Sequence, residues 1–191
     1  MKIFSLIYGL VLLALMAGCS GRFVSEEFLR EDVDLEAISR IAVLPFQNNS
    51  NDLYASERSR NIAITQLLAM GVADVVDRGV VDSVMIEEVI DPTLPVDMIN
   101  LKRLGQRLNV QAFLLGSVDL VDSTAAGSSK YPQVALTLRL VDAQASMIIW
   151  QASGRWTTET ILGRIFGIAP TDNFHVNLKL IRNMLRNLAQ K

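Results

Sequence analysis

The sequence predicts a mixed α/β fold, a two-layer α/β sandwich in which a mixed sheet of about five strands carries helices on one side. Three observations predict this fold. Strand-like and helix-like segments alternate along residues 37–191, the strand-like segments are strongly apolar, and the chain ends in an amphipathic helix. With 191 residues, 50% of them hydrophobic, and a net charge of -2, the chain can bury one ordinary core and is not predicted to be disordered.

The first half of this region predicts two strands and three helices. The opening strand is β-branched and ends beside Pro45, which is typical of a strand end. The first helix follows a cluster of Asn and Ser and stops at Gly71, because glycine is favoured just past a helix. Asp97 is predicted to cap the third helix. The predicted bounds are 38–46 (strand), 53–70 (helix), 72–77 (strand), 79–89 (helix) and 97–108 (helix).

The second half predicts three strands and a final helix. Residues 110–121 are almost entirely apolar, as in a central strand. Val134, Leu136, Leu138 and Leu140 alternate with Ala135, Thr137 and Arg139, as in a strand with one buried face. Residues 147–156 are the predicted hairpin partner of that strand. Helical spacing of apolar residues predicts a last helix from about Asp172. Its predicted apolar face consists of Phe174, Leu178, Ile181, Leu185 and Leu188.

Residues 1–18 are predicted to be a lipoprotein signal peptide. After Lys2 comes an apolar run that is shorter than the roughly 20 residues a membrane-spanning helix needs. The run ends in a segment that resembles the lipobox of bacterial lipoproteins, with Cys19 as the only cysteine of the chain. The lipobox residues are Leu15, Met16, Ala17, Gly18 and Cys19. We therefore predict cleavage before Cys19 and a covalent lipid on it. In the bacterial lipoproteins that this segment resembles, Ser at the position after the Cys goes with outer-membrane sorting, so the resemblance implies that Ser20 directs the protein to the outer membrane, facing the periplasm.

Residues 19–36 are predicted to be the lipid-anchored cysteine followed by a charged, solvated tether. Acidic residues dominate this segment and few of its residues are apolar. At roughly 3.3–3.6 Å per residue, the tether reaches at most about 60 Å. Residues 37–191 then form a single periplasmic α/β domain that works close to the membrane holding its lipid.

Composition and motifs exclude several classes of function. The net charge of -2 gives no basis for nucleic-acid binding, and one Cys with one His cannot supply a zinc finger or most catalytic zinc sites. The sequence contains no GxxxxGK[ST], GxGxxG or GxSxG motif. His175 is expected on the surface of the last helix, and the carboxylate pairs Glu87-Glu88 and Asp74/Asp77 are expected to be solvated or to cap helices. We therefore predict no catalytic residue, no metal and no cofactor other than the lipid on Cys19.

Two features are candidates for contact with a partner or a membrane. The polar side of the last helix carries Lys179, Arg182 and Arg186, either an ordinary basic solvent face or a patch for anionic lipid headgroups or an acidic partner. The second is an apolar segment that includes Ile165 and Phe166. It is either a short buried helix or an exposed segment for subunit or membrane contact.

Four segments in the order and spacing found here resemble the CsgG superfamily, which includes the LpoB-type activators of peptidoglycan synthases and the N-terminal domain of TolB. The segments are IAVLPFQN (41–48), VVDR (75–78), LGQRLNVQAFLLGSV (104–118) and LTLRLVDAQASMIIW (136–150). The resemblance implies a periplasm-facing α/β domain on an outer-membrane lipid anchor, without enzymatic chemistry. It also implies a role like that of relatives in curli secretion, surface-polymer or flagellar assembly, or activation of cell-wall synthesis.

Two departures from that family bear on function. The transmembrane hairpins of the secretion channel would fall at 119–132 and 158–171, but each segment has only 14 residues. A pair of membrane strands needs about 20 residues before any turn, so we predict that this chain lacks them. The tether is also short for an activator. Two functions stay open: an assembly or secretion accessory that contacts an envelope protein or forms a homo-oligomeric ring, and a regulatory activator of a peptidoglycan synthase.

Overall fold

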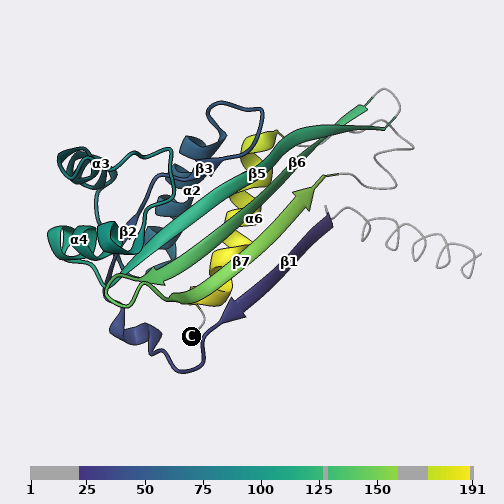
Figure 1. Cartoon of the computed structure of the whole chain (residues 1–191). Coiled ribbons are helices and arrows are strands. Elements are labelled where there is room, and N and C mark those ends of the chain that lie inside the picture. Colours follow the sequence, from purple (N-terminus) through teal and green to yellow (C-terminus); the bar gives the residue numbers. More distant parts are fainter. Residues whose placement is uncertain (1–21, 127–128, 159–171, 190–191) are drawn as a thin grey trace, which may run out of the picture.

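The computed structural model describes residues 22–126, 129–158 and 172–189, which form a mixed α/β fold around one open sheet (Figure 1). The predicted fold class is thus confirmed. In this part of the chain the sheet has seven strands, where about five were predicted. The strands are β1 (Arg22–Leu29), β2 (Arg40–Val43), β3 (Gln47–Asn48), β4 (Asp74–Val75), β5 (Ala112–Ala126), β6 (Ser129–Asp142) and β7 (Ile148–Thr157). The helices are the 3-10 turn η1 (Leu35–Ala37), α2 (Ala55–Met70), α3 (Arg78–Glu87), α4 (Met98–Leu108) and α6 (Asn173–Ala189).

The sheet combines an antiparallel and a parallel half. Its strand order is β1-β7-β6-β5-β2-β4, and the short β3 also pairs with β5. Strands β5, β6, β7 and β1 are antiparallel neighbours, whereas β2 is parallel to both β4 and β5. The predicted strand over 110–121 continues to Ala126, so β5 and β6 form a longer hairpin than expected. Its register shifts between Val118 and Leu120, which makes Asp119 the extra residue of a β-bulge.

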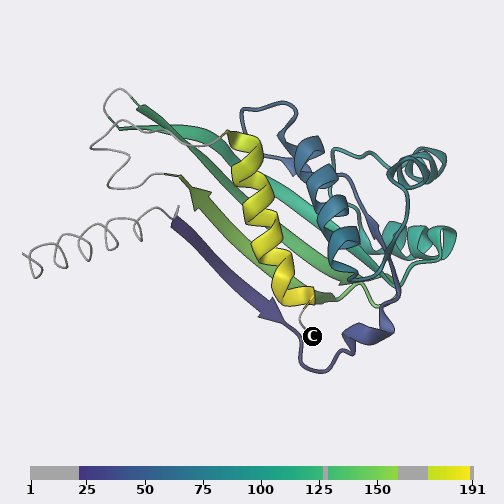
Figure 2. The same ribbon diagram turned by 180° about the vertical axis from the view of Figure 1, so that it is seen from behind.

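Helices lie on both faces of the sheet, where the sequence predicted them on one side. Ile41 and Val43 of β2 belong to a core with α2 and α6, which cover one face of the sheet (Figure 2). Ala42 of β2 and Leu44, which directly follows the strand, point the opposite way and pack with α3 and α4. Strand β2 is apolar on both sides because it lies inside the parallel part of the sheet, and such strands need cover on both faces.

The edge strand β1 corrects the prediction of a solvated tether. It pairs antiparallel with β7 along its whole length, and η1 (Leu35–Ala37) follows it. Glu27 accepts a hydrogen bond of 2.8 Å from the indole N–H of Trp150, and the rings of Phe23 and Trp156 lie 5.3 Å apart. These contacts hold a segment rich in charge against the sheet, although its composition is that of a linker.

Helix α6 packs on the antiparallel half of the sheet, as its predicted amphipathic pattern indicates. Its buried apolar side chains are Val176, Leu180, Ile181, Met184, Leu185 and Leu188. Leu178 is only partly buried, and Phe174, predicted on the apolar face, is exposed. Gly154 of β7 permits the close approach, because a Cβ there would lie 3.0 Å from the Leu180 side chain. Asp172 caps the helix by accepting a 2.9 Å hydrogen bond from the His175 amide.

Candidate functional site

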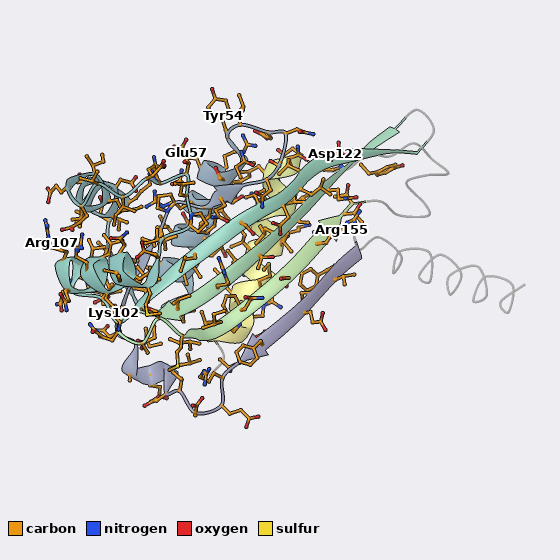
Figure 3. The ribbon with its side chains drawn as sticks, viewed as in Figure 1. Tyr54, Glu57, Lys102, Arg107, Asp122 and Arg155 are labelled. Atoms are coloured by element: carbon orange, nitrogen blue, oxygen red, sulfur yellow. The ribbon has the colours of Figure 1, made fainter. Side chains whose placement is uncertain are left out.

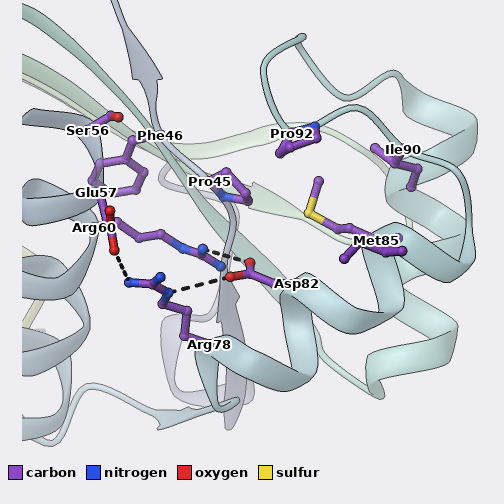
Figure 4. A pocket seen from close by; sticks show the side chains of 11 residues that line it. Pro45, Phe46, Ser56, Glu57, Arg60, Arg78, Asp82, Met85, Ile90 and Pro92 are labelled. Carbon is purple, nitrogen blue, oxygen red and sulfur yellow. Dashed lines mark ion pairs between the residues drawn. The ribbon is translucent and has the colours of Figure 1, made fainter. Parts of the chain in front are cut away.

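A cavity of about 410 Å³ lies between the end of β2, the start of α2 and helix α3 (Figure 4). One part of its lining is apolar and the other carries two arginines and two carboxylates. The apolar lining is formed by Pro45, Phe46, Met85, Ile86, Ile90 and Pro92. The polar lining is formed by Ser56, Glu57, Arg60, Arg78 and Asp82. The cavity therefore offers both apolar area and hydrogen-bonding groups, the combination that is typical of binding sites.

Arg60 is the buried charge of this cavity. Its Nε and Nη2 donate hydrogen bonds of 3.1 and 2.8 Å to the carbonyl oxygen of Val43, and its Nη1 lies 2.7 Å from Asp82 Oδ1. Burial lowers the pKa of the Arg60 guanidinium, and the bond with Asp82 opposes this shift. The guanidinium stays protonated, because even a lowered arginine pKa is far above neutral. Arg60 thus fastens α2 to β2 and to α3 at the same time.

Arg78 extends the series of ion pairs from Asp82 to Glu57. Its Nη1 lies 3.0 Å from Glu57 and donates a 2.9 Å hydrogen bond to Asn61, and its Nε lies 3.5 Å from Asp82. The two guanidinium groups and two carboxylates alternate, so the polar wall is close to neutral in total. Such a wall suits a ligand that brings apolar and hydrogen-bonding groups, for example a segment of a partner protein, better than a highly charged one.

A second polar cluster lies on the face of the sheet opposite α2 and α6. Asp119, at the β-bulge, accepts hydrogen bonds of 2.9 Å from Ser117 and 3.1 Å from Thr137. Thr137 and Ser153 lie 3.0 Å apart across β6 and β7. These side chains form a row across three strands, and cross-strand hydroxyl pairs of this kind stabilise an exposed sheet face.

The residues that the sequence singled out for contact fall into two groups. Lys179, Arg182 and Arg186 are exposed along α6, opposite its buried side, as a basic solvent face would be. Their role in binding a partner or a membrane stays a prediction. Ile165, Phe166 and the lipobox residues Leu15, Met16, Ala17, Gly18 and Cys19 lie outside the described residues. Within those residues, no helix is long and apolar enough to cross a membrane.

The acidic and imidazole groups considered in the sequence lie at helix ends and on the surface, and Asp74 is an exposed residue of β4. Asp77 caps α3 by accepting a 2.8 Å hydrogen bond from the Gly79 amide. Glu87 and Glu88 form ion pairs with the arginines of α4. His175 is exposed, and its Nδ1 lies 3.0 Å from Asp172. In the described part of the chain, no group of three His, Cys, Asp or Glu side chains is placed to hold a metal ion.

The Arg60–Asp82 pair is not predicted from the sequence. A signal for it exists, because Arg60 precedes the buried Ala63 and Leu67 by three and seven residues, the spacing of one helix face. A charged residue in such a series indicates a buried, paired charge. No comparable signal identifies Asp82 as its partner, because α3 meets α2 only in the folded chain.

Comparisons with known proteins support the fold. No protein-family model matches the chain, and no curated protein matches it by sequence. Several solved structures resemble it, including these three. The PelC dodecamer from Paraburkholderia phytofirmans aligns with a TM-score of 0.61 and 19% identity, covering 88% of this chain and 98% of that one. The lipoprotein GNA1162 from Neisseria meningitidis aligns with a TM-score of 0.56 and 18% identity, covering 80% and 99%.

The third is LpoB from E. coli, with a TM-score of 0.50 and 13% identity over 62% of this chain and 57% of that one. At these identities the similarity shows the fold alone. The predicted LpoB-like fold is thereby supported, and it is a fold that at least one lipoprotein shares. The resemblance to the secretion channel and to TolB stays a prediction from sequence.

Proposed function

We propose that this protein is a non-enzymatic, lipid-anchored periplasmic protein of the outer membrane that acts by protein contact in envelope or surface-structure assembly or secretion. In this proposal the lipid on Cys19 is its only cofactor, and nucleic acid is not a partner. It works on an envelope protein or with further copies of itself. The observation that carries the proposal is the fold shared with a dodecamer and with a lipoprotein, in a chain whose residues 15–19 resemble a lipobox.

The cavity beside Arg60 supports the same proposal. Its lining combines apolar side chains with paired charges whose sum is close to zero, a surface that matches a mixed polar and apolar protein segment. The PelC structure is a dodecamer, and a chain with this fold can in principle use the same kind of assembly. We therefore include a homo-oligomer among the proposed states.

A second candidate function is a regulatory activator of a peptidoglycan synthase. The LpoB-like fold favours it. The length of chain between the predicted anchor and the fold weighs against it, since β1 already begins at Arg22. The alternative is therefore retained as an outcome of the same experiment.

The test is crosslinking of the full-length protein in its native envelope, followed by mass spectrometry of the products. Crosslinks to secretion or surface-polymer components, or a ladder of self-crosslinks, would support the proposal. Recovery of a peptidoglycan synthase as the crosslinked partner would support the activator instead. A Cys19→Ser variant is the matched control, because it should lose both the acyl mass on the mature N-terminus and its outer-membrane fractionation. An unmodified N-terminus in the wild-type protein would contradict the anchoring.

A further inference from the structure

One end of the sheet lies next to the point where the predicted lipid anchor enters the fold. Strand β1 begins at Arg22, only three residues after Cys19, and the backbone of Arg22 is paired with that of Thr157 at the end of β7. Three residues span roughly 10 Å when fully extended. The start of β1 therefore stays within about this distance of any lipid bound to Cys19.

The same end carries partly exposed aromatic and aliphatic side chains. Phe23, Val24 and Phe174 are 36%, 58% and 49% exposed. The ring of Phe23 lies 5.3 Å from that of Trp156, which is partly buried. Figure 2 shows the start of α6, the end of β7 and the start of β1 at one end of the molecule. We call Phe23, Val24, Arg155, Trp156 and Phe174 the anchor end.

We propose that the anchor end rests on the lipid headgroups of the membrane that holds the Cys19 lipid. The inference rests on the lipidation included in the proposed function. Tryptophan gathers at membrane–water interfaces, because its ring is apolar and its N–H can form a hydrogen bond. The exposed Phe23, Val24 and Phe174 side chains would add apolar area to that contact. Arg155 is exposed at the same end of β7 (Figure 3) and adds a cation at the depth of the lipid phosphates.

The pairing of β1 makes this placement a property of the fold. A solvated linker would let the domain move away from the bilayer. Strand β1, in contrast, is held to β7 by antiparallel backbone pairing and by the hydrogen bond from the Trp150 indole to Glu27. The chain that remains outside the sheet is then too short to carry the anchor end clear of the headgroups. Two observations therefore indicate that the anchor end contacts the membrane. The chain between Cys19 and Arg22 is short, and the exposed side chains of the anchor end suit a lipid surface.

The positions of the two tryptophans of the chain allow this orientation to be measured. Trp150 and Trp156 both lie on β7, six residues apart, and the antiparallel register places Trp156 opposite Phe23 and Trp150 opposite Leu29. At about 3.3 Å per residue they are separated by roughly 20 Å along the strand. Only Trp156 belongs to the anchor end.

The test uses the lipidated full-length protein in vesicles of phosphatidylethanolamine and phosphatidylglycerol, part of which carry bromine on the upper acyl chain. A Trp150→Phe variant keeps only Trp156, and a Trp156→Phe variant keeps only Trp150. We expect the fluorescence of the first to be quenched several-fold more than that of the second. If Trp150→Phe does not fold, the wild-type protein takes its place, since Trp156→Phe should lose most of the wild-type quenching.

Equal quenching of the two variants, or no quenching of either on vesicles that carry the protein, would overturn the proposed orientation. Flotation of the vesicles and the mass of the N-terminus are measured on the same samples. A protein that floats through its lipid without Trp156 quenching refutes the anchor end alone. A protein with no lipid on Cys19 refutes the proposed function and this inference with it.

Discussion

Replacement of Arg60 by Met tests whether the buried ion pair holds the cavity together. Methionine retains an unbranched apolar stem but cannot bind the Val43 carbonyl or Asp82. A hydrogen bond to a charged group contributes about 1.5–3 kcal/mol. The Asp82 side chain is 35% exposed and keeps Arg78 at 3.5 Å, so the loss of its pair with Arg60 adds less than a fully buried pair would. We expect the variant to lose about 3 kcal/mol of unfolding free energy.

This loss of unfolding free energy is measured by urea unfolding of the mature chain, with tryptophan fluorescence as the signal. With a slope of about 1–3 kcal/mol per molar urea, the midpoint should fall by roughly 1–3 M. Arg58→Met is the matched control. Arg58 lies on the same helix and is ion-paired with Asp52, but its side chain is 40% exposed. Pairs of that kind contribute about 0–1 kcal/mol, so the control midpoint should hardly move.

Equal losses in the two variants would refute the reasoning, because burial would then not distinguish the two pairs. Arg60→Lys refines the result. Lysine retains the positive charge but is a point donor without the fork that reaches two acceptors. We expect its unfolding free energy to lie between those of the wild-type protein and Arg60→Met. A Lys variant as stable as the wild type would mean that charge, and not the forked geometry, holds α2 to β2.

Two further predictions concern the ends of the fold. Glu27→Ala removes the acceptor of the Trp150 indole, so the amides of β1 should exchange with deuterium about 5-fold faster, the equivalent of a hydrogen bond of about 1 kcal/mol; Glu26→Ala, on the opposite face of the strand, should leave the exchange unchanged. The His175 amide hydrogen bond holds the pKa of Asp172 below its usual value of 3.8. The stability contributed by the ionised Asp172 carboxylate is therefore fully present above pH 3.8. It is lost as the pH falls through the lower pKa of the folded state. Asp172→Asn, which keeps the cap, should flatten this acid dependence of thermal stability.

The helices were predictable because the signals at their ends are local. Gly71 adopts the left-handed conformation with φ of 65° just past α2, which is the conformation that favours glycine there. Asp97 accepts a 2.9 Å hydrogen bond from the Asn100 amide, so the predicted cap of α4 is confirmed. Each of these interactions joins residues within one turn of chain, and the residue types alone indicate them.

The edge strand β1 was not predictable in the same way, because its partner lies far along the chain. Glu27 accepts a hydrogen bond from Trp150, which lies 123 residues further along the chain. The side chains of β1 that face α6 include both apolar and acidic groups. A strand of this kind has no apolar alternation for a sequence pattern to detect. Acidic groups on an edge strand also oppose pairing with other chains, which is a physical reason for a linker-like composition in a strand.

The docking of β1 also changes how the two proposed functions compare. A free tether of 17 residues would let the domain reach about 60 Å from the predicted lipid on Cys19. With β1 in the sheet, Arg22 lies only three residue steps after Cys19, and the reach falls to roughly 10 Å. An activator that meets its synthase across the periplasm depends on reach, whereas an assembly factor that meets its partners at the outer membrane depends on a fixed orientation. A paired strand directly after the predicted anchor would restrict reach and fix orientation, and it therefore favours the proposed contact at the membrane surface.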